Sequence, residues 1–433
     1  MDISALVLLL VFFLLLVLNA PIAIAIAVAT LSAMLFTIDF TAATTTVAQR
    51  MAGGINSFTM VAIPLFILSG VLMGRGGIAH RLIELAKALI GTLPGGLALV
   101  NVVSTTLFGA ISGSAVASAS AMGGFLVPAM EKEGYDKNFS AALTVASSTA
   151  GLLIPPSNVL IIYSLASGGV SIAALFVAGY VPGLLLGLSL MIIGSVYAVR
   201  KGYPVSDRIP FAEALRRLMD ALPSLLLIVI VIGGIISGIF TATEASGIAV
   251  LYALLLSVVV YREVKPAELP AILLKTAETS AIVLFLVAAS TAMSWMLSYQ
   301  NIPQSMSAFL IGLSDNPYVI LMMITLILLV VGAFIDITPA ILIFTPIFLP
   351  VVTELGMSPL HFGIVIVLNL CIGLCTPPVG SVLFVGCSIA RSNMTALVRP
   401  LLPMYGAMFV ILLLITYVPA LSEWLPRAVG LME

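Results

Sequence analysis

The sequence predicts an all-α polytopic membrane protein, and its composition, its apolar segments and an internal repeat support this fold class. Of the 433 residues, 61% are hydrophobic and 8% are charged, whereas soluble domains carry roughly 25% charged residues. A soluble protein could not cover so much apolar surface with polar side chains. Lys+Arg number 17 and Asp+Glu number 18, so the chain has no basic field that could bind nucleic acid.

Several classes of protein are excluded by what the sequence lacks. His80 and His361 are the only histidines, which leaves little for a metal centre or a histidine-based catalytic site. The sequence has no P-loop motif, so we expect no ATP binding of that kind, and it has no H-E-x-x-H helix of a metalloprotease, so we expect a transporter and not an enzyme. The N-terminal apolar segment follows Asp2 and lacks a basic region, so we do not expect a cleaved secretory signal.

Ten apolar segments are expected to cross the membrane. Residues 3–36 would form one helix of about 51 Å, which exceeds the roughly 30 Å of a bilayer core. Asn19 and Pro21 divide this run into two short spans. The expected crossings are residues 3–18, 20–36, 58–74, 140–166, 172–199, 218–239, 242–261, 276–299, 362–390 and 400–419.

Two further apolar segments, 97–128 and 318–353, are interrupted by polar residues. The interruptions are Ser112-Gly113-Ser114 and Asp336-Ile337-Thr338-Pro339. Each half is about 15 residues, or roughly 22 Å of helix, which is short for a crossing. We expect both segments to be re-entrant helical hairpins, because non-helical backbone is tolerated at membrane depth only beside protein or a water-filled cavity.

The distribution of Lys and Arg predicts the orientation of these segments. If the N-terminus lies outside and neither hairpin crosses, only Arg50 and Arg427 lie on the outer side, which would also hold the C-terminus. The positive-inside rule places basic residues on the cytoplasmic side. This orientation agrees with the rule, because the other fifteen basic residues then lie on the cytoplasmic side. They are Arg75, Arg81, Lys87, Lys132, Lys137, Arg200, Lys201, Arg208, Arg216, Arg217, Arg262, Lys265, Lys275, Arg391 and Arg399.

The middle and the C-terminal part of the chain share a spacing of Pro and Gly. Five pairs are each separated by 222 residues: Pro128 and Pro350, Gly134 and Gly356, Gly151 and Gly373, Pro155 and Pro377, Pro156 and Pro378. In the predicted topology the two units have opposite orientations, which is the layout of an inverted-repeat secondary transporter. Chance agreement is the alternative, since both residue types are common in membrane helices.

Each unit contains a helix that is interrupted by Gly-x-x-x-Pro-Pro, at residues 151–156 and 373–378. Proline lacks an N–H group and disrupts the preceding turn, so nearby carbonyl oxygens lose their helical partners. Such oxygens suit Na⁺, and the N-termini of half-helices attract anions. The pattern predicts at least two Na⁺ sites beside one anion site, while a kink that serves packing is the alternative.

Candidate solute-binding side chains lie at the hairpin turns and beside the two breaks. Asp336 is a carboxylate at membrane depth, which indicates a functional role, and helix capping is its alternative. For the hydroxyl and amide side chains, close helix packing is the alternative. These are Ser112, Ser114, Ser157, Asn158, Thr376 and Ser381. Glu244 and Glu278 lie near span ends, where capping or solvation explains them, and residues 77–91 form an amphipathic stretch that suits the cytoplasmic interface.

Four motifs occur in order along the chain. They are Phe108-Gly-Ala-Ile-Ser-Gly-Ser-Ala-Val-Ala, Gly151-Leu-Leu-Ile-Pro-Pro-Ser, Gly238-Ile-Phe-Thr-Ala-Thr-Glu-Ala and Gly373-Leu-Cys-Thr-Pro-Pro-Val-Gly. Together they resemble the large membrane subunit of TRAP (tripartite ATP-independent periplasmic) transporters, over nearly the whole chain. The resemblance implies an elevator mechanism that couples Na⁺ to import of a carboxylate solute. It also implies two partners, a small four-helix membrane subunit and a periplasmic substrate-binding protein.

The resemblance further implies two Na⁺ sites, each between a hairpin and a helix break. The first would lie between the turn at Ser112 and carbonyl groups near Gly151, Ile154 and Pro156. The second would lie between Gly332 and the residues Gly373, Thr376 and Val379. Ser112, Ser157 and Asp336 would face the solute. Many relatives carry a carboxylate where this chain has Ser118, so a charged role is not expected there.

The expected domains follow from the repeat. They are N-terminal scaffold helices (1–57), a first repeat (58–200), central scaffold and linking helices (201–275), a second repeat (276–420) and a C-terminal tail (421–433). We expect the chain to lie in lipid in the bacterial inner membrane, with both termini in the periplasm. The resemblance implies a carboxylate solute of the C4-dicarboxylate or sialic-acid kind, and a stand-alone Na⁺/carboxylate symporter of related fold is the alternative function.

Overall fold

The protein is helical throughout the part that the structure describes. The computed structural model describes residues 3–203, 205 and 209–432, and these ranges contain helices and turns but no strand. The predicted all-α membrane fold is therefore confirmed. Within these ranges, eight helical segments are long and apolar enough to cross a membrane. Asp2, which precedes the first apolar segment, and Arg208, which was predicted to be cytoplasmic, lie outside the described residues.

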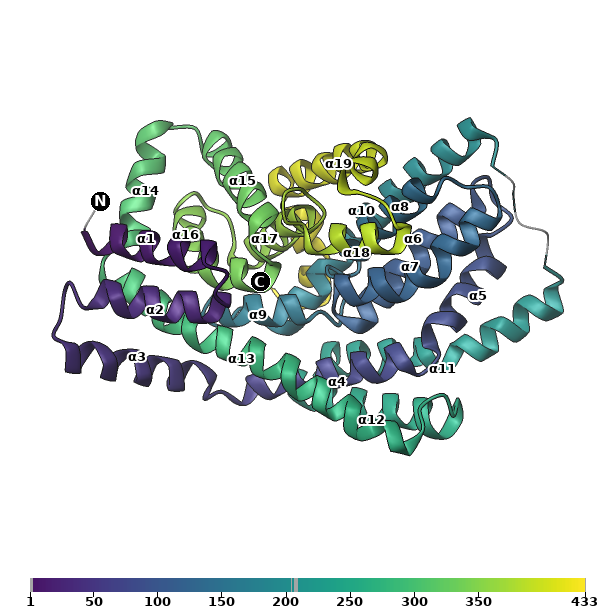
Figure 1. The fold of residues 1–433 in the computed structure, drawn as a ribbon, viewed down its shortest axis with the longest axis horizontal. Coiled ribbons are helices and arrows are strands. Elements are labelled where there is room, and N and C mark those ends of the chain that lie inside the picture. Colours follow the sequence, from purple (N-terminus) through teal and green to yellow (C-terminus); the bar gives the residue numbers. More distant parts are fainter. Residues whose placement is uncertain (1–2, 204, 206–208, 433) are drawn as a thin grey trace.

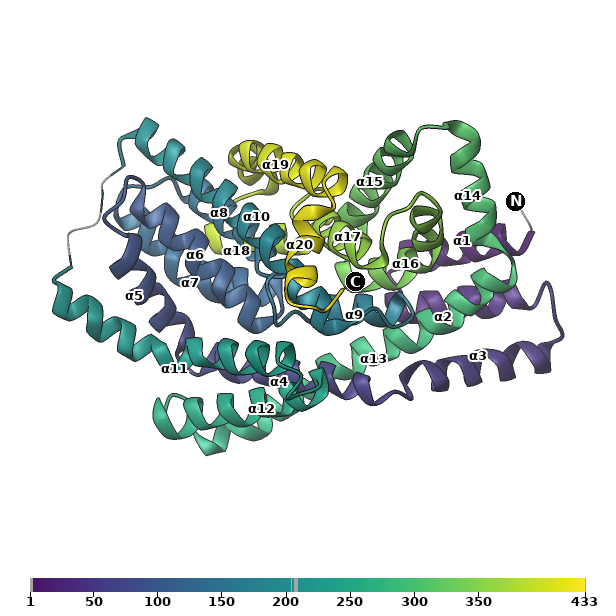
Figure 2. The ribbon, with the colours of Figure 1, turned by 180° about the vertical axis from the view of Figure 1, so that it is seen from behind.

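Five helices form a layer along one long side of the molecule, which we call the basal layer (Figure 1). They are α3 (Phe40–Ile55), α4 (Ala62–Arg75), α11 (Phe211–Ile236), α12 (Ala242–Leu254) and α13 (Leu269–Tyr299). The short segments η1 (Phe58–Val61), η2 (Leu255–Val260) and η3 (Pro266–Glu268) extend or connect them. Figure 2 shows the same layer from behind. Helix α13 packs against α3 and α4, and α4 packs against α12.

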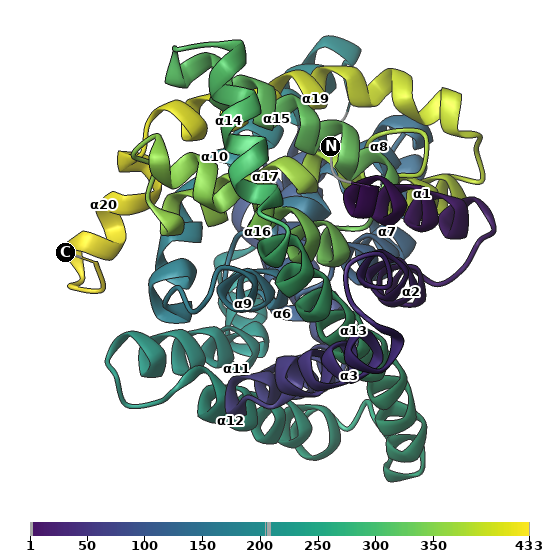
Figure 3. The same cartoon turned by 90° about the vertical axis from the view of Figure 1, so that its left-hand side faces the viewer.

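The N-terminal helices attach to one end of this layer. Helix α1 (Ile3–Val17) packs on α2 (Ile22–Met34), and α2 packs on α13, as Figure 3 shows from the end of the molecule. Helix α3 was not predicted, because its threonines and its polar end weaken the apolar pattern. Its start is fixed by Asp39, whose carboxylate accepts a hydrogen bond of 3.1 Å from the N–H of Ala42, as expected of an N-cap residue.

Each segment predicted to be a hairpin is a pair of packed helices with its break at the predicted residues. The first pair is α6 (Gly96–Ser112) and α7 (Ala115–Lys132), and the second is α15 (Pro317–Phe334) and α16 (Ile337–Glu354). The depth of their turns in a bilayer, and hence their re-entrant character, stays a prediction. The predicted amphipathic stretch forms helix α5 (Ile78–Ile90), which packs against α11 of the basal layer and against α6.

Both helices predicted to be broken are interrupted at their diproline segments. Residues 151–157 separate α8 (Lys137–Ala150) from α9 (Asn158–Ala166), and residues 375–380 separate α17 (Pro359–Leu374) from α18 (Ser381–Ala390). The Pro155–Pro156 and Pro377–Pro378 bonds are cis. We call the two hairpins and the two broken helices, together, the central unit.

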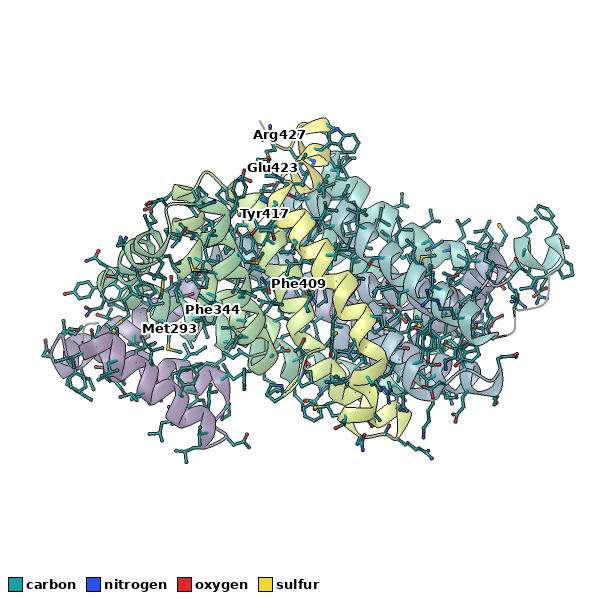
Figure 4. All side chains as sticks on the ribbon, turned by 90° about the horizontal axis from the view of Figure 1, so that it is seen from above. Met293, Phe344, Phe409, Tyr417, Glu423 and Arg427 are labelled. Atoms are coloured by element: carbon teal, nitrogen blue, oxygen red, sulfur yellow. The ribbon has the colours of Figure 1, made fainter. Side chains whose placement is uncertain are left out.

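The remaining helices surround the central unit. They are α10 (Ile172–Lys201), α14 (Ile302–Leu313), α19 (Met394–Tyr417) and α20 (Ala420–Ala428). Figure 4 shows Glu423 and Arg427 on α20, beyond Tyr417 at the end of α19. Helix α20 forms most of the predicted tail, and it is held to α17 because Glu423 accepts a hydrogen bond from Ser358, the N-cap residue of α17. Glu423 also pairs with Arg427 of its own helix at 2.9 Å.

Helix α13 corrects one part of the sequence analysis. It runs without a break over 31 residues, so Lys275, which was placed in a cytoplasmic loop, lies inside a helix, and the expected boundary between residues 275 and 276 divides that helix. Lys275 and Glu278 form an ion pair of 3.6 Å one turn apart, an arrangement that stabilises a helix modestly at a surface. Lys275 and Glu278 therefore lie inside α13 and do not mark where this helix begins.

Candidate functional site

The two hairpin turns and the two helix breaks meet around one cavity of about 820 Å³. Ser112, Ser114 and Asn158 line it from the first repeat, and Asp336 and Ser381 line it from the second. The volume lies within the range of small-molecule sites, roughly 300–1,000 Å³. Five of the seven candidate solute-binding residues therefore share one space, although they are up to 269 positions apart in the sequence, whereas Ser157 and Thr376 lie outside its lining.

The first hairpin turn is held in close contact with the basal layer and with α9. Gly113 has φ +62°, and a Cβ atom on it would lie 2.8 Å from Nδ2 of Asn158. A Cβ atom on Gly70 of α4 would lie 2.8 Å from the carbonyl oxygen of Ser112. Ser114 caps α7 by accepting a hydrogen bond of 3.2 Å from the N–H of Ala117. Gly113 thus allows the close approach of the turn to α9, while Ser114 caps α7 and its hydroxyl oxygen already accepts a hydrogen bond.

Asp336 occupies the second hairpin turn and faces the cavity. It stands at the N-cap position of α16, but its side chain makes no capping hydrogen bond. One carboxylate oxygen instead accepts a hydrogen bond of 3.1 Å from the hydroxyl of Ser381, the first residue of α18. The side chain therefore does not accept from the second or third N–H of α16 as an N-cap residue does; it lies beside the N–H of Ile337 and accepts from Ser381.

Asn158 and Ser157 stand side by side in the sequence but differ in their surroundings. Asn158 begins α9 and lines the cavity, and its buried Oδ1 atom has no described hydrogen-bond partner. Ser157 is fully buried, lies outside the cavity lining, and donates to the carbonyl oxygen of Leu152 at 2.5 Å. Ser157 was expected to face the solute. In the structure it lies outside the cavity lining, and its hydroxyl donates to a carbonyl oxygen of the non-helical segment.

Close glycine contacts join each hairpin to its own broken helix. A Cβ atom on Gly151 would lie 2.6 Å from Cα of Gly109, and one on Gly373 would lie 2.5 Å from Cα of Gly332. Real Cβ atoms do not approach other atoms so closely, so these positions require glycine. The contacts place the non-helical carbonyl groups of each break directly beside a hairpin.

The predicted ion-binding residues of the first set have free carbonyl oxygens. No described group donates a hydrogen bond to the carbonyl oxygens of Gly151, Ile154 or Pro156. Buried carbonyl oxygens normally have a partner, so this segment offers ligand atoms of the kind that Na⁺ prefers. Ser112, at the adjoining turn, directs its own hydroxyl toward backbone oxygens of Gly109 and Ser114, at 3.5 and 3.3 Å.

The second predicted set is more fully engaged. The carbonyl of Gly373 accepts from the N–H of Thr376 at 2.8 Å, and the hydroxyl of Thr376 donates to the carbonyl oxygen of Ile372 at 2.7 Å. The N–H of Val379 donates to Ala333, the neighbour of Gly332, at 3.1 Å. No described donor reaches the carbonyl oxygens of Thr376 and Val379. The residues of the second predicted ion site therefore lie around the Gly332–Gly373 contact, and the carbonyl oxygens of Thr376 and Val379 are free to bind an ion.

Three polar or charged cavity residues of the basal layer were not predicted to lie at the site. Arg75 in the last turn of α4, and Lys275 and Thr279 in α13, line the same space. The spacing of four between Lys275 and Thr279 places them on one helix face, and this was a usable signal. Arg75 and Lys275 were interpreted only as cytoplasmic charges that define the topology, so their position beside the site was not predicted.

Ser118 makes a buried hydrogen bond of 2.7 Å to the carbonyl oxygen of Thr105 across the first hairpin.

Comparison with known protein families identifies one match that covers nearly all of the chain. Residues 9–421 match the family described as "Tripartite ATP-independent periplasmic transporter, DctM component". The chain is 54% identical over 415 residues to the uncharacterized protein YgiK of Salmonella typhimurium, covering 96% of this chain and 95% of that protein.

Two relatives with functional names are also similar over most of their length. The chain is 40% identical over 374 residues to the C4-dicarboxylate TRAP transporter large permease protein DctM of Pseudomonas aeruginosa, covering 86% of this chain and 87% of that protein. It is 39% identical over 380 residues to the sialic acid TRAP transporter large permease protein SiaM of Vibrio cholerae, covering 88% and 89%.

The fold is similar to that of a transporter of known structure. The crystal structure of the YdaH transporter of Alcanivorax borkumensis superposes with a TM-score of 0.62, covering 92% of this chain and 90% of that chain. The sequence identity is 16%, so this likeness concerns the fold alone.

Proposed function

Because the chain belongs to the family of large membrane subunits (DctM components) of TRAP transporters, we propose that it moves an acidic solute through the cavity between its two helix breaks, using a Na⁺ gradient. The observation that carries this proposal is the meeting of both hairpin turns and both breaks at one cavity. A transporter of this kind needs one solute site that is coupled to nearby ion sites. It is a transporter subunit and not an enzyme.

The solute that we propose is a carboxylate, either a C4-dicarboxylate or a sialic acid. Relatives that are 39–40% identical are named for these two solutes. The cavity offers the N-termini of α9 and α18, the amide of Asn158 and the hydroxyl of Ser112, while the hydroxyl proton of Ser381 is donated to Asp336. Helix N-termini and amide or hydroxyl donors stabilise a carboxylate. Asp336 would then orient Ser381 and interact with hydroxyl groups of the solute.

Two Na⁺ ions would bind where the non-helical segments meet the hairpins. The first would use the free carbonyl oxygens of Gly151, Ile154 and Pro156 with the turn at Ser112. The second would lie near Gly332, Gly373, Thr376 and Val379. Neutral oxygen ligands at a helix break suit Na⁺. Bound Na⁺ would hold each break against its hairpin and so shape the cavity for the solute.

An elevator movement is the mechanism that we propose for translocation. Each hairpin is locked to its broken helix by a glycine contact, and the two broken helices contact each other through Tyr163, whose hydroxyl donates to the carbonyl oxygen of Pro359 at 2.5 Å. The central unit is therefore suited to move as one body against the basal layer. The cavity lies at the border between the two, where Gly70 meets Ser112.

The family description implies a tripartite system. We propose that the chain lies in the bacterial inner membrane with both termini in the periplasm. A small four-helix membrane subunit would support the basal layer, and a periplasmic binding protein would deliver the solute. No ATP would be consumed by this chain.

Reconstitution tests the proposal. The purified chain is placed in liposomes alone, with the small subunit, or with the small subunit and the binding protein, and uptake of radiolabelled succinate and N-acetylneuraminate is measured. Uptake that requires both partners and an inward Na⁺ gradient, and that disappears when K⁺ replaces Na⁺, supports it. Uptake by the chain alone would favour the stand-alone symporter, and unsaturable flux without Na⁺ dependence would indicate a channel.

A further inference from the structure

The wall of the cavity that belongs to the basal layer carries two cations. Arg75 lies in the last turn of α4 and Lys275 lies in α13, and both line the cavity with exposed side chains. Thr279 lies one helical turn from Lys275 and lines the same wall. The opposite wall, which belongs to the central unit, carries Asp336 and uncharged polar groups. The two walls therefore have opposite character.

The charge of the basal wall is only partly balanced. Lys275 pairs with Glu278 at 3.6 Å, but both side chains are more than half exposed, and such pairs are weak. None of the described acidic side chains lies within ion-pair distance of Arg75. A cavity with protein walls strengthens the field of such charges. An anion inside it would therefore be drawn toward the basal wall.

The position of Arg75 relative to the first hairpin turn is fixed by α4. Gly70 meets the carbonyl oxygen of Ser112, and Arg75 follows five residues later, about 7.5 Å further along the helix axis. Its long side chain is thus separated from the turn while it still reaches the same cavity. The cations and the turns occupy neighbouring parts of one space.

We propose that Arg75 and Lys275 form a second anion-binding station, on the basal layer, which holds the acidic group of the solute after it leaves the hairpin turns. A guanidinium group binds a carboxylate with two parallel hydrogen bonds, and an ammonium group attracts it as a point charge. Because the station lies on the basal layer and the turns lie on the central unit, movement of one against the other would separate the two sets of ligands. The inference rests on the proposed acidic solute and extends it to specific residues.

The field of the station can be measured without any solute. Thr279→Cys is made in a Cys387→Ser background, since Cys371 and Cys375 are buried and Cys387 is half-buried. The rates of modification by an anionic reagent (methanethiosulfonate ethylsulfonate) and a cationic one (its ethyltrimethylammonium analogue) are compared. We expect Arg75→Gln with Lys275→Gln to lower the anionic-to-cationic rate ratio by roughly tenfold. The effect should weaken in about 1 M salt, where the Debye length is about 3 Å.

A matched control separates this local field from a general change of charge. Arg399 in α19 is exposed and lies outside the cavity lining, so Arg399→Gln should leave the rate ratio unchanged. An unchanged ratio in the Arg75/Lys275 double variant would overturn the station, as would an equal fall in Arg399→Gln. The latter result would indicate that these basic residues act through lipid headgroups, the usual role of Lys and Arg beside a membrane.

A second measurement tests the binding role. In the reconstituted three-component system, exchange of succinate and of N-acetylneuraminate is followed as the concentration inside the vesicle is varied. The double variant should raise the half-saturating concentration on one side of the membrane by roughly tenfold, with an unchanged Na⁺ dependence. Equal values for variant and wild type would overturn the binding role. If the wild type transported neither acid, the proposed function would be wrong. The modification rates at position 279 would still test whether Arg75 and Lys275 create a positive potential at the station.

Discussion

The thiol of Cys371 donates a weak hydrogen bond of 3.5 Å to the carbonyl oxygen of Thr149, and these two residues occupy equivalent positions in the two repeats, 222 residues apart. Equivalent residues can touch only where the axis that relates the two repeats passes between them. The predicted inverted relation between the repeats would therefore place its axis at the contact between α8 and α17, just before the two breaks. The contacts around each break should accordingly be duplicated, and the paired glycines show that they are.

This duplication predicts equal costs for equivalent substitutions. Gly151→Ala and Gly373→Ala each place a Cβ atom about 2.6 Å or less from a hairpin backbone, where no flexible side chain can yield. Overpacking of this kind costs about 1–3 kcal/mol. Both variants should therefore lower the midpoint of thermal unfolding in detergent by similar amounts.

The control for this prediction is Gly247→Ala in α12. An added Cβ atom there has no neighbour within 4 Å, so the unfolding midpoint should stay the same or rise. Wild-type stability of both break variants would show that the glycine contacts do not constrain the hairpins.

Asp336→Asn tests the carboxylate at the second hairpin turn. The asparagine keeps the shape and can still accept from Ser381, but it removes the charge that an intramembrane carboxylate contributes to function. We expect uptake to fall at least about tenfold while expression and the unfolding midpoint stay close to wild type. Asp39→Asn, at an exposed helix cap outside the cavity lining, is the control. Normal uptake by a well-expressed Asp336→Asn protein would remove Asp336 from the site.

Local signals in the sequence were sufficient to locate the helix breaks. Pro155–Pro156 and Pro377–Pro378 are consecutive prolines, so each pair removes two adjacent N–H donors and interrupts the helix, whereas single prolines such as Pro182 and Pro223 lie inside continuous helices. The breaks and both hairpin turns were therefore predicted at the correct residues. The same reasoning could not separate Ser157 from Asn158, since only packing decides which of two adjacent side chains faces the cavity.

The basal wall of the site could not be predicted from local pattern. Arg75 and Lys275 are 200 residues apart and line the same cavity because α4 and α13 pack together. In the sequence they read as charges that end apolar segments, and this interpretation hid their position beside the hairpin turns. Helices α3 and α14 were missed for a related reason, since each is too short or too polar to be distinguished as a membrane span.

Thr376→Ala tests the second proposed ion site. The hydroxyl of Thr376 holds the carbonyl oxygen of Ile372 at 2.7 Å and so fixes the first turn of the break. Its loss should leave the neighbouring carbonyl ligands less ordered and raise the Na⁺ concentration for half-maximal uptake several-fold. Thr376→Ser keeps the hydroxyl and should restore the wild-type Na⁺ curve. An unchanged curve in Thr376→Ala would exclude this residue from the ion site.

Cysteine labelling tests the orientation of the whole chain. Glu133 follows α7 and Asp315 precedes α15, and both are exposed, so a cysteine at either position can be reached by a reagent. In the Cys387→Ser background, Glu133→Cys should react with a membrane-impermeant maleimide only after the inner membrane is opened. Asp315→Cys should react in intact spheroplasts, since the two hairpins are expected to open on opposite faces. Reaction of both from the same side would mean that one hairpin crosses the bilayer, which would remove the inverted relation between the repeats and with it the basis for two matched ion sites.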